Sequence, residues 1–198
     1  MNAMMDILLA FIIGGMLILS AMRMDINVKS HAIRRRHDLS AQENIHVMAD
    51  MLEYDIRKIG HALPISQLPI IAADSNSITF QYYMVSKSNI NDTTKYQIQY
   101  KTLPAQETEN PNDLALQRIV NGNQDGGGSL GLIRLNFEYR NHHYQLLPTP
   151  VCADSLRSIR QILITMQAQS RYSYNNEYAN ASFVTRILPK NLLDHRGL

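Results

Sequence analysis

The chain of 198 residues begins with one long apolar stretch, MMDILLAFIIGGMLILSAMRMD, at residues 4–25. Its uncharged part covers residues 7–22, with Asp6 before it and Arg23 after it. As a helix, this part would be about 24 Å long, and residues 2–5 and Met24 extend it to the roughly 30 Å of a hydrocarbon core. We therefore predict a retained membrane helix at the start of the chain.

Two other interpretations of the stretch remain. A secretory signal would carry basic residues before the apolar run and an Ala-x-Ala cleavage site after it, and the sequence has neither. A buried core helix would be equally apolar. The orientation is a separate problem, because Arg23, Lys29 and the basic cluster at residues 34–36 all follow the apolar run. The positive-inside rule would place everything after them in the cytoplasm.

Residues 39–60, LSAQENIHVMADMLEYDIRKIG, continue the helical pattern with one apolar face. Apolar side chains recur there at three- and four-residue steps, which is the spacing of one helix face. This apolar stripe consists of Ile45, Met48, Leu52, Ile56 and Ile59. Gly60 can adopt the left-handed conformation that ends a helix, and Pro64 follows soon after. Residues 23–38 contain neither Pro nor Gly, so we expect one helix from about residue 4 to residue 59.

After Pro64 the hydrophobic period changes from 3.6 to 2, which indicates β-strands. The predicted strands are residues 77–85, 95–101, 133–140, 144–147, 162–166 and 183–188. The residues NHH between the third and fourth strands predict a hairpin. Three polar, Gly- or Asn-rich segments are predicted to be loops, at residues 104–113, 121–131 and 169–181.

Strands joined by turns, without helical crossovers, favour an antiparallel sheet. One face of that sheet needs a cover, and the apolar stripe of the long helix can supply it. The predicted fold class is therefore α+β, with a long N-terminal helix, apolar and then amphipathic, packed on an antiparallel β-sheet. We expect residues 1–60 to form a membrane and assembly helix and residues 61–198 to form a β head domain.

Composition and motifs give little support to catalysis. The formal net charge of +2 provides no strong attraction to nucleic acid, and the cluster at residues 34–36 is expected to be a solvated helix face or a contact with lipid headgroups. Cys152 is the only cysteine, which excludes an internal disulfide and a cysteine-based zinc motif, and we expect it to be a buried structural thiol. The adjacent His142 and His143 are expected to lie in a solvated turn.

Other polar motifs also lack a chemical partner. Ser155 is not in a G-x-S-x-G elbow, and DGGGSLG at residues 125–131 lacks the lysine and the helix of a phosphate loop. We expect solvated ion pairs near the end of the long helix. They involve Asp50, Glu53 and Asp55, beside Arg57 and Lys58. The sequence therefore predicts no enzyme, with no catalytic residue, no cofactor and no metal.

Three phrases, together with the predicted layout, resemble a known family. AQENIHVMADMLEYDIRKIGHAL at residues 41–63 is similar to the family's helix end, where QEN precedes a phrase of the form L..D.R.aG. SLRSIRQILITM at residues 155–166 resembles its late strand, and TRILPKNL at residues 185–192 resembles its C-terminal ending. The family is that of type IV pilins and pseudopilins, and the resemblance is greatest to the PilW-like minor pilins and the J-type pseudopilins of type II secretion.

The resemblance implies a non-catalytic subunit of a type IV filament system, a pilus or a type II secretion system, acting in a tip or priming complex. The implied partners are other pilin or pseudopilin subunits, through helix packing, together with the inner-membrane assembly machinery and membrane lipid; the sequence gives no direct evidence of nucleic-acid binding. The helix would cross the inner membrane once, with the head outside, before extraction into a filament. The alternative is a single-pass membrane protein whose extracytoplasmic β domain binds or senses something and never polymerises.

The resemblance also gives assembly roles to Asp6, Gly14 and Gly15. Pilins carry a glutamate at the fifth mature position, which is thought to neutralise the N-terminal amine of a neighbouring subunit, and Asp6 would be fifth if mature numbering began at Asn2. A carboxylate in hydrocarbon costs about 2.5–3.5 kcal/mol, so it needs a partner. Alternatively, Asp6 lies at the membrane surface and only favours the helix N-terminus. The glycines either let the helix stretch after it leaves the bilayer or are simply tolerated.

The start of the chain departs from the family pattern. Pilins are made with a short basic leader that ends in Gly, followed by an aromatic residue and the glutamate, whereas this sequence has Asp6 and no such leader before it. We expect that a leader was trimmed, that the start site is misassigned, or that the chain is inserted without prepilin peptidase. A basic leader would hold the N-terminus in the cytoplasm, which would place the head outside and resolve the orientation problem.

Overall fold

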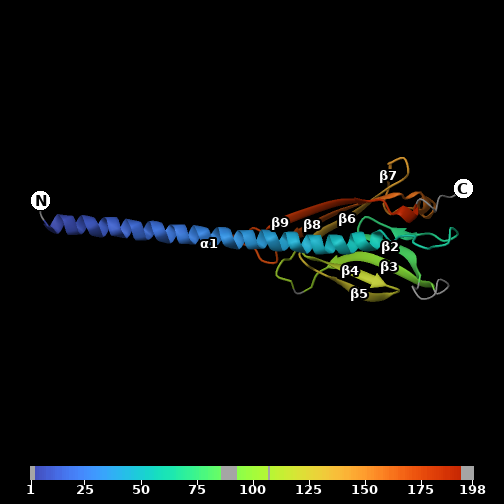
Figure 1. The fold of residues 1–198 in the computed structure, drawn as a ribbon, viewed down its shortest axis with the longest axis horizontal. Coiled ribbons are helices and arrows are strands. Elements are labelled where there is room, and N and C mark those ends of the chain that lie inside the picture. Colours follow the sequence, from blue (N-terminus) through green and yellow to red (C-terminus); the bar gives the residue numbers. More distant parts are fainter. Residues whose placement is uncertain (1–2, 86–92, 107, 193–198) are drawn as a thin grey trace.

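The structure is a computed structural model that describes residues 3–85, 93–106 and 108–192, and it consists of a head on one long helix (Figure 1). The helix α1 (Ala3–Ile56) has 54 residues, which corresponds to about 81 Å. Residues 3–40 of α1 are called the stem below. The stem has no buried residue, and most of it extends beyond the head (Figure 1).

The head contains two antiparallel sheets, and the second half of α1 runs between them (Figure 1). Sheet A has the strand order β1 (Ile70–Ala73), β2 (Ser77–Val85), β3 (Thr93–Pro104), β4 (Leu114–Val120), β5 (Asn123–Gly128). Sheet B has the order β7 (Leu146–Leu147), β6 (Leu132–Arg140), β8 (Gln161–Gln169), β9 (Asn180–Ile187). Two short 3-10 helices, η1 (Ala153–Ser158) and η2 (Lys190–Leu192), flank β8 and β9 in the chain.

The apolar stripe of α1 lies at the centre of a core shared by both sheets. All five of its side chains are at most 2% exposed. Sheet A contributes Phe80 and Tyr100 to the same cluster, and sheet B contributes Phe137 and Tyr139. The predicted cover for the strands is confirmed, and so is the α+β fold class. The strands form two sheets on either side of the helix, whereas the sequence suggested one.

The end of α1 differs from the prediction by a few residues. The regular helix ends at Ile56, and the next turn tightens, because the amides of Lys58 and Ile59 donate to carbonyls three residues earlier, at 3.0 and 3.2 Å. Gly60 then has the expected positive φ, at 73°. Its amide donates to the carbonyl of Gln81 in β2, so the turn connects the helix directly to sheet A.

The six predicted strands are present, and three further strands were missed. β1 and β4 were not predicted, and β5 lies in the segment 121–131 that was predicted to be a loop. The alternation in β6 also shifts, because a bulge between Leu132 and Arg134 buries Leu132 in place of Ile133. The hairpin from β6 to β7 is confirmed by the pairing of Tyr139 with Leu147.

β5 is a strand because its backbone pairs with β4, not because of its side chains. Its sequence, NQDGGG, has no apolar residue. Gly127 pairs with Gln117 and has φ +108°. A Cβ at this position would lie 1.9 Å from the carbonyl oxygen of Leu116, so only glycine permits this close pairing.

Candidate functional site

The stem carries most of the exposed large apolar side chains among the described residues. An 18-residue window within α1 has a mean hydropathy of 2.2, and none of it is buried. By length and composition this helix could cross a membrane. Every large apolar side chain in residues 4–24 is at least half exposed, from Ile13 as the least to Met4 as the most exposed. Such a surface marks a contact with lipid or with protein.

Asp6, Gly14 and Gly15 all lie on the stem, but the structure does not bring them into one site. Asp6 is in the first turn of α1, and the glycines follow about 12 Å further along the axis. Apart from the nearby backbone of the helix itself, a Cβ built on either glycine has no atom within 4 Å, so no contact among the described residues explains why these positions are small. Their assembly roles stay predictions. Asn2, at which mature numbering would begin, lies outside the described residues.

The connection between β8 and β9 holds the end of the stem. The Tyr174 hydroxyl and the Ser30 hydroxyl are hydrogen-bonded at 2.8 Å. The guanidinium of Arg34 lies over the Tyr174 ring, 5.5 Å from its centroid. All three arginines of the basic cluster at residues 34–36 are exposed, but Arg34 also contacts the head, so the cluster is only partly a free solvated face.

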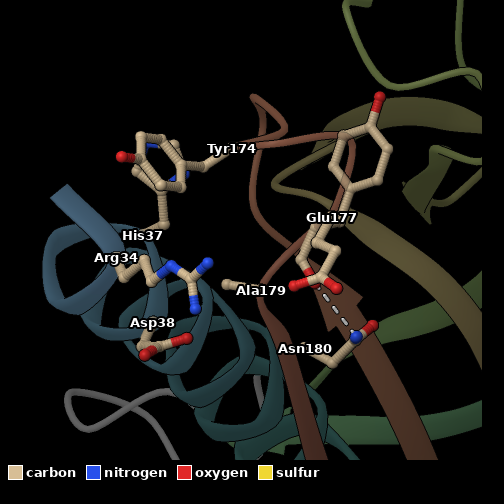
Figure 2. A pocket seen from close by; sticks show the side chains of 8 residues that line it. Arg34, His37, Asp38, Tyr174, Glu177, Ala179 and Asn180 are labelled. Carbon is tan, nitrogen blue, oxygen red and sulfur yellow. Dashed lines mark hydrogen bonds between the residues drawn. The ribbon is translucent and has the colours of Figure 1, made fainter. Parts of the chain in front are cut away.

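A cavity of about 260 Å³ lies beside this contact. Figure 2 shows Arg34 and Asp38 on α1 at one side and Glu177 and Asn180 at the other. Both signs of charge line it, which gives no preference for an anion or a cation. Within the residues that the structure describes, no three His, Cys, Asp or Glu side chains are placed to hold a metal ion. The cavity is best described as the joint between stem and head.

A buried ionic network, which the sequence pattern did not predict, connects α1 to sheet A. Asp55 is 1% exposed, so the prediction that it is solvated is wrong. Its carboxylate accepts hydrogen bonds from Arg118 Nε in β4 and from the Tyr100 hydroxyl in β3, both at 2.7 Å. Lys58 Nζ lies 3.3 Å from its other oxygen. Arg118 also pairs with Asp125 in β5.

The network alters the acidity of its members in a consistent way. Burial raises the pKa of the Tyr100 phenol, and the nearby charge of Asp55 raises it further. Burial alone would lower the pKa of Arg118, but the hydrogen bond and charge of Asp55 outweigh burial and raise it. Both groups therefore stay protonated, and the carboxylate of Asp55 accepts from two donors that do not titrate near neutral pH.

Glu53 connects α1 to sheet B. Its carboxylate accepts a hydrogen bond from the Thr185 hydroxyl in β9 at 2.6 Å and pairs with Arg57 at 3.0 Å. These two hydrogen bonds, in that order, lower the pKa of Glu53. Of the predicted solvated ion pairs, that of Glu53 is present, with Arg57, whereas Asp50 has no ion pair within the described residues. The second half of α1 is thus joined by polar contacts to both sheets, in addition to the apolar stripe.

Two further predictions concern the head. Cys152 is exposed, so the expected buried thiol is wrong; the neighbouring Val151 is the residue that packs into the core. The Sγ of Cys152 lies 3.1 Å from the Ser155 hydroxyl, and hydrogen bonding to Ser155 lowers the pKa of the thiol. The turn with His142 and His143 is exposed, as predicted.

Comparison with known proteins bears on the fold. No protein-family model matches the sequence, and no curated protein matches it. Among solved structures, the chain is similar to a type IV-like pilin from Thermus thermophilus, with a TM-score of 0.51 and 11% sequence identity. The match covers 76% of this chain and 97% of that one. At such low identity the likeness shows a shared pilin-like fold, a long N-terminal helix packed against antiparallel sheets.

Proposed function

We propose that this chain is a non-catalytic subunit of a type IV filament system, a minor pilin or pseudopilin that assembles through α1. The observation that carries the proposal is the bare stem. It is about 57 Å of helix whose apolar side chains find no partner within the described chain, attached to a head of pilin-like fold.

The stem suits two environments in turn. Residues 7–22 carry no charge and have no polar face, which fits the hydrocarbon of a membrane. The same surface fits a bundle of sister stems, because packed helices replace lipid with equally apolar contacts. In this proposal the chain spans the inner membrane once, with its head outside, and the assembly machinery then draws the stem out of the lipid into a filament of pilin or pseudopilin subunits.

Asp6 gives the proposal a chemical requirement. A carboxylate near the start of an apolar helix is unfavourable in hydrocarbon unless a positive group neutralises it. The N-terminal amine of a neighbouring subunit supplies that charge in a filament, and a membrane anchor that stays alone has no equivalent partner. The tip or priming role follows from the resemblance to PilW-like minor pilins and J-type pseudopilins, and it is part of the same proposal.

The test compares two acidic residues of the stem. In cells that make the filament, Asp6→Ala should lose incorporation into the sheared filament fraction while it still inserts into the membrane. Asp25→Ala is the matched control, because Asp25 lies beyond the apolar stretch and pairs with Lys29 within the chain at 2.7 Å. It should assemble normally. The N-terminal sequence of the protein recovered from cells identifies the mature first residue.

Normal assembly of Asp6→Ala would contradict the amine-pairing role. A wild-type chain that stays in the membrane fraction, in cells whose other subunits form filaments, would contradict the filament proposal itself. That second result would favour the membrane-anchored binding or sensing domain.

A further inference from the structure

Along α1 and the residue that follows it, the face opposite the apolar stripe carries a column of charges at seven-residue spacing. This charged column consists of Lys29, Arg36, Glu43, Asp50 and Arg57. At 100° per residue it lies about 180° from the apolar stripe, so it points away from the core of the head. All five side chains are exposed. Seven-residue spacing is the repeat by which one helix packs along another.

A second column beside it is mostly apolar and has the same spacing. This apolar column consists of Leu19, Ile26, Ile33, Ser40, Val47 and Tyr54. Its five large side chains are all exposed, from Ile33 at 42% to Tyr54 at 64%. Adjacent apolar and charged columns that both repeat every seven residues are typical of a helix that pairs with a parallel or antiparallel partner.

The middle of the charged column has no partner of its own within the described residues. Lys29 pairs with Asp25, and Arg57 pairs with Glu53, each within one turn of the helix. No ion pair joins Arg36, Glu43 or Asp50 to any side chain that the structure describes. These three charges are therefore available to a second molecule.

A second copy of the chain can only pack parallel to the first, because both stems enter the same membrane from their N-terminal ends. This step rests on the proposed function. In register, two parallel copies would place like charges opposite each other along the whole column. A displacement of one heptad places two pairs of like charges and two pairs of unlike charges opposite each other. A displacement of three heptads places one pair of like charges and one pair of unlike charges opposite each other.

A displacement of two heptads leaves only unlike pairs. It sets Lys29 opposite Glu43, Arg36 opposite Asp50, and Glu43 opposite Arg57. It also sets Ile33 of the apolar column opposite Val47. The column drifts by about 20° per heptad on a straight helix, which a slight left-handed supercoil corrects.

We propose that this face of α1 is a contact between two copies of the chain, parallel and displaced by two heptads, about 21 Å along the axis. Copies at the same depth in the membrane repel each other along the charged column. The two charged columns attract each other only when one copy is displaced along the axis, away from the membrane. The charges therefore determine the register of assembly more than its affinity. At this offset Asp6 is level with Ser20 of the other copy, and neither residue lies on the contacting face, so an Asp6–amine contact involves a different neighbour.

Cross-linking measures the register directly. All variants carry Cys152→Ser, because the native thiol is exposed. Cells that co-express Ile33→Cys and Val47→Cys chains should form a disulfide dimer on addition of a thiol oxidant. A disulfide dimer formed by either chain expressed alone would report in-register packing. A dimer of the Val47→Cys and Ser40→Cys chains would report a displacement of one heptad. A dimer of the Val47→Cys and Ile26→Cys chains would report a displacement of three heptads. A dominant dimer from any of these, or no dimer from any combination, overturns the proposal.

Charge reversal tests the cause of the register. Arg36→Glu in the Ile33→Cys chain should lower the yield of the Ile33→Cys/Val47→Cys dimer about fivefold, since it places a like charge opposite Asp50 of the other chain. Adding Asp50→Arg to the Val47→Cys chain should restore the yield, because the pair is then reversed. Arg35→Glu is the matched control, with the same charge change one position off the column. Equal loss with both reversals, or no rescue, contradicts the proposal.

The filament fraction separates this inference from the proposed function. A chain that enters filaments but cross-links in another register contradicts the inference alone. A chain that never leaves the membrane contradicts the proposed function.

Discussion

Replacing Asp55 by asparagine tests whether the ionic network holds α1 to sheet A. Asparagine keeps the shape of the side chain and can still accept from the Tyr100 hydroxyl. It removes the charge that faces Arg118 Nε at 2.7 Å and Lys58 Nζ at 3.3 Å. The two cations would then lie beside a neutral group in a site that is 1% exposed at its centre.

The structure indicates that the loss of stability caused by Asp55→Asn lies near the lower end of the range known for broken buried ion pairs. Removing one partner of a buried ion pair destabilises a protein by about 3–5 kcal/mol, because the other charge is left buried. Here the remaining cations are partly solvated, with side chains 18% exposed for Arg118 and 22% for Lys58. Arg118 also keeps Asp125. We therefore expect Asp55→Asn to lower the free energy of unfolding by about 3 kcal/mol.

The assay uses the full chain in detergent micelles. Urea titrations followed by the near-ultraviolet circular dichroism of the tyrosines report tertiary packing in the head, and the stem contributes no tyrosine to this signal. Asp50→Asn is the matched control, with the same chemical change at an exposed position of the same helix. It should change the free energy of unfolding by less than about 0.5 kcal/mol.

A double-mutant cycle shows whether the pair acts as a unit. Arg118→Met alone leaves the carboxylate buried with Lys58 and Tyr100, and it should also cost about 3 kcal/mol. The double variant should be less destabilised than the two losses together, with a coupling energy of about 2 kcal/mol. The reasoning fails if Asp55→Asn matches Asp50→Asn, or if the two losses simply add.

Two further substitutions test other details of the head in the same assay. Asp113 is 5% exposed and has a carboxylate oxygen without a hydrogen-bond partner, and burial raises its pKa. Its carboxyl group therefore contributes fully to the stability of the fold below the unfolded pKa of about 3.9, and this contribution is lost as pH rises through the folded pKa. Asp113→Asn should therefore stabilise the chain by about 1 kcal/mol at pH 7, with the gain vanishing below about pH 4, and a gain independent of pH would contradict this. Gly127→Ala should destabilise it by at least about 2 kcal/mol, because the new Cβ meets the Leu116 carbonyl, whereas Gly126→Ala, in open space, should cost about half as much.

The helix and the longest strands were predictable because their side chains repeat with the period of their own geometry. The apolar stripe matches one face of α1, and residues 77–85 coincide with β2. β1, β4 and β5 carry no such repeat. β1 has only four residues, and β5 depends on backbone pairing of glycines with β4. Sequence periodicity reports side-chain burial, so strands held mainly by backbone pairing escape it.

The buried network escaped prediction for a related reason. Asp55 lies between Leu52 and Ile56, beside the apolar stripe, and that position was a signal that it is buried. Its partner Arg118, however, is on β4, which the sequence did not reveal. A buried charge is acceptable only with a partner, so without β4 the solvated interpretation was the simpler one. Asp6 differs from Asp55, because the partner predicted for it belongs to another molecule, and the role predicted for Gly14 and Gly15 concerns the helix after it leaves the bilayer.

If the stem is drawn out of lipid during assembly, the joint between α1 and the head must withstand the pull. Burial of the apolar stripe contributes about 7–15 kcal/mol, at about 1.5–3 kcal/mol for each of its five side chains, and the contacts of Asp55 and Glu53 add to it. On the same scale, the nine Ile, Leu and Phe residues of the segment 7–22 favour hydrocarbon over water by about 14–27 kcal/mol, which exceeds the contribution of the stripe. The stem should therefore leave the bilayer before α1 separates from the sheets only if sister stems replace its lipid contacts as they are lost. The contacts to both sheets are thus what allow a force on the stem to move the head.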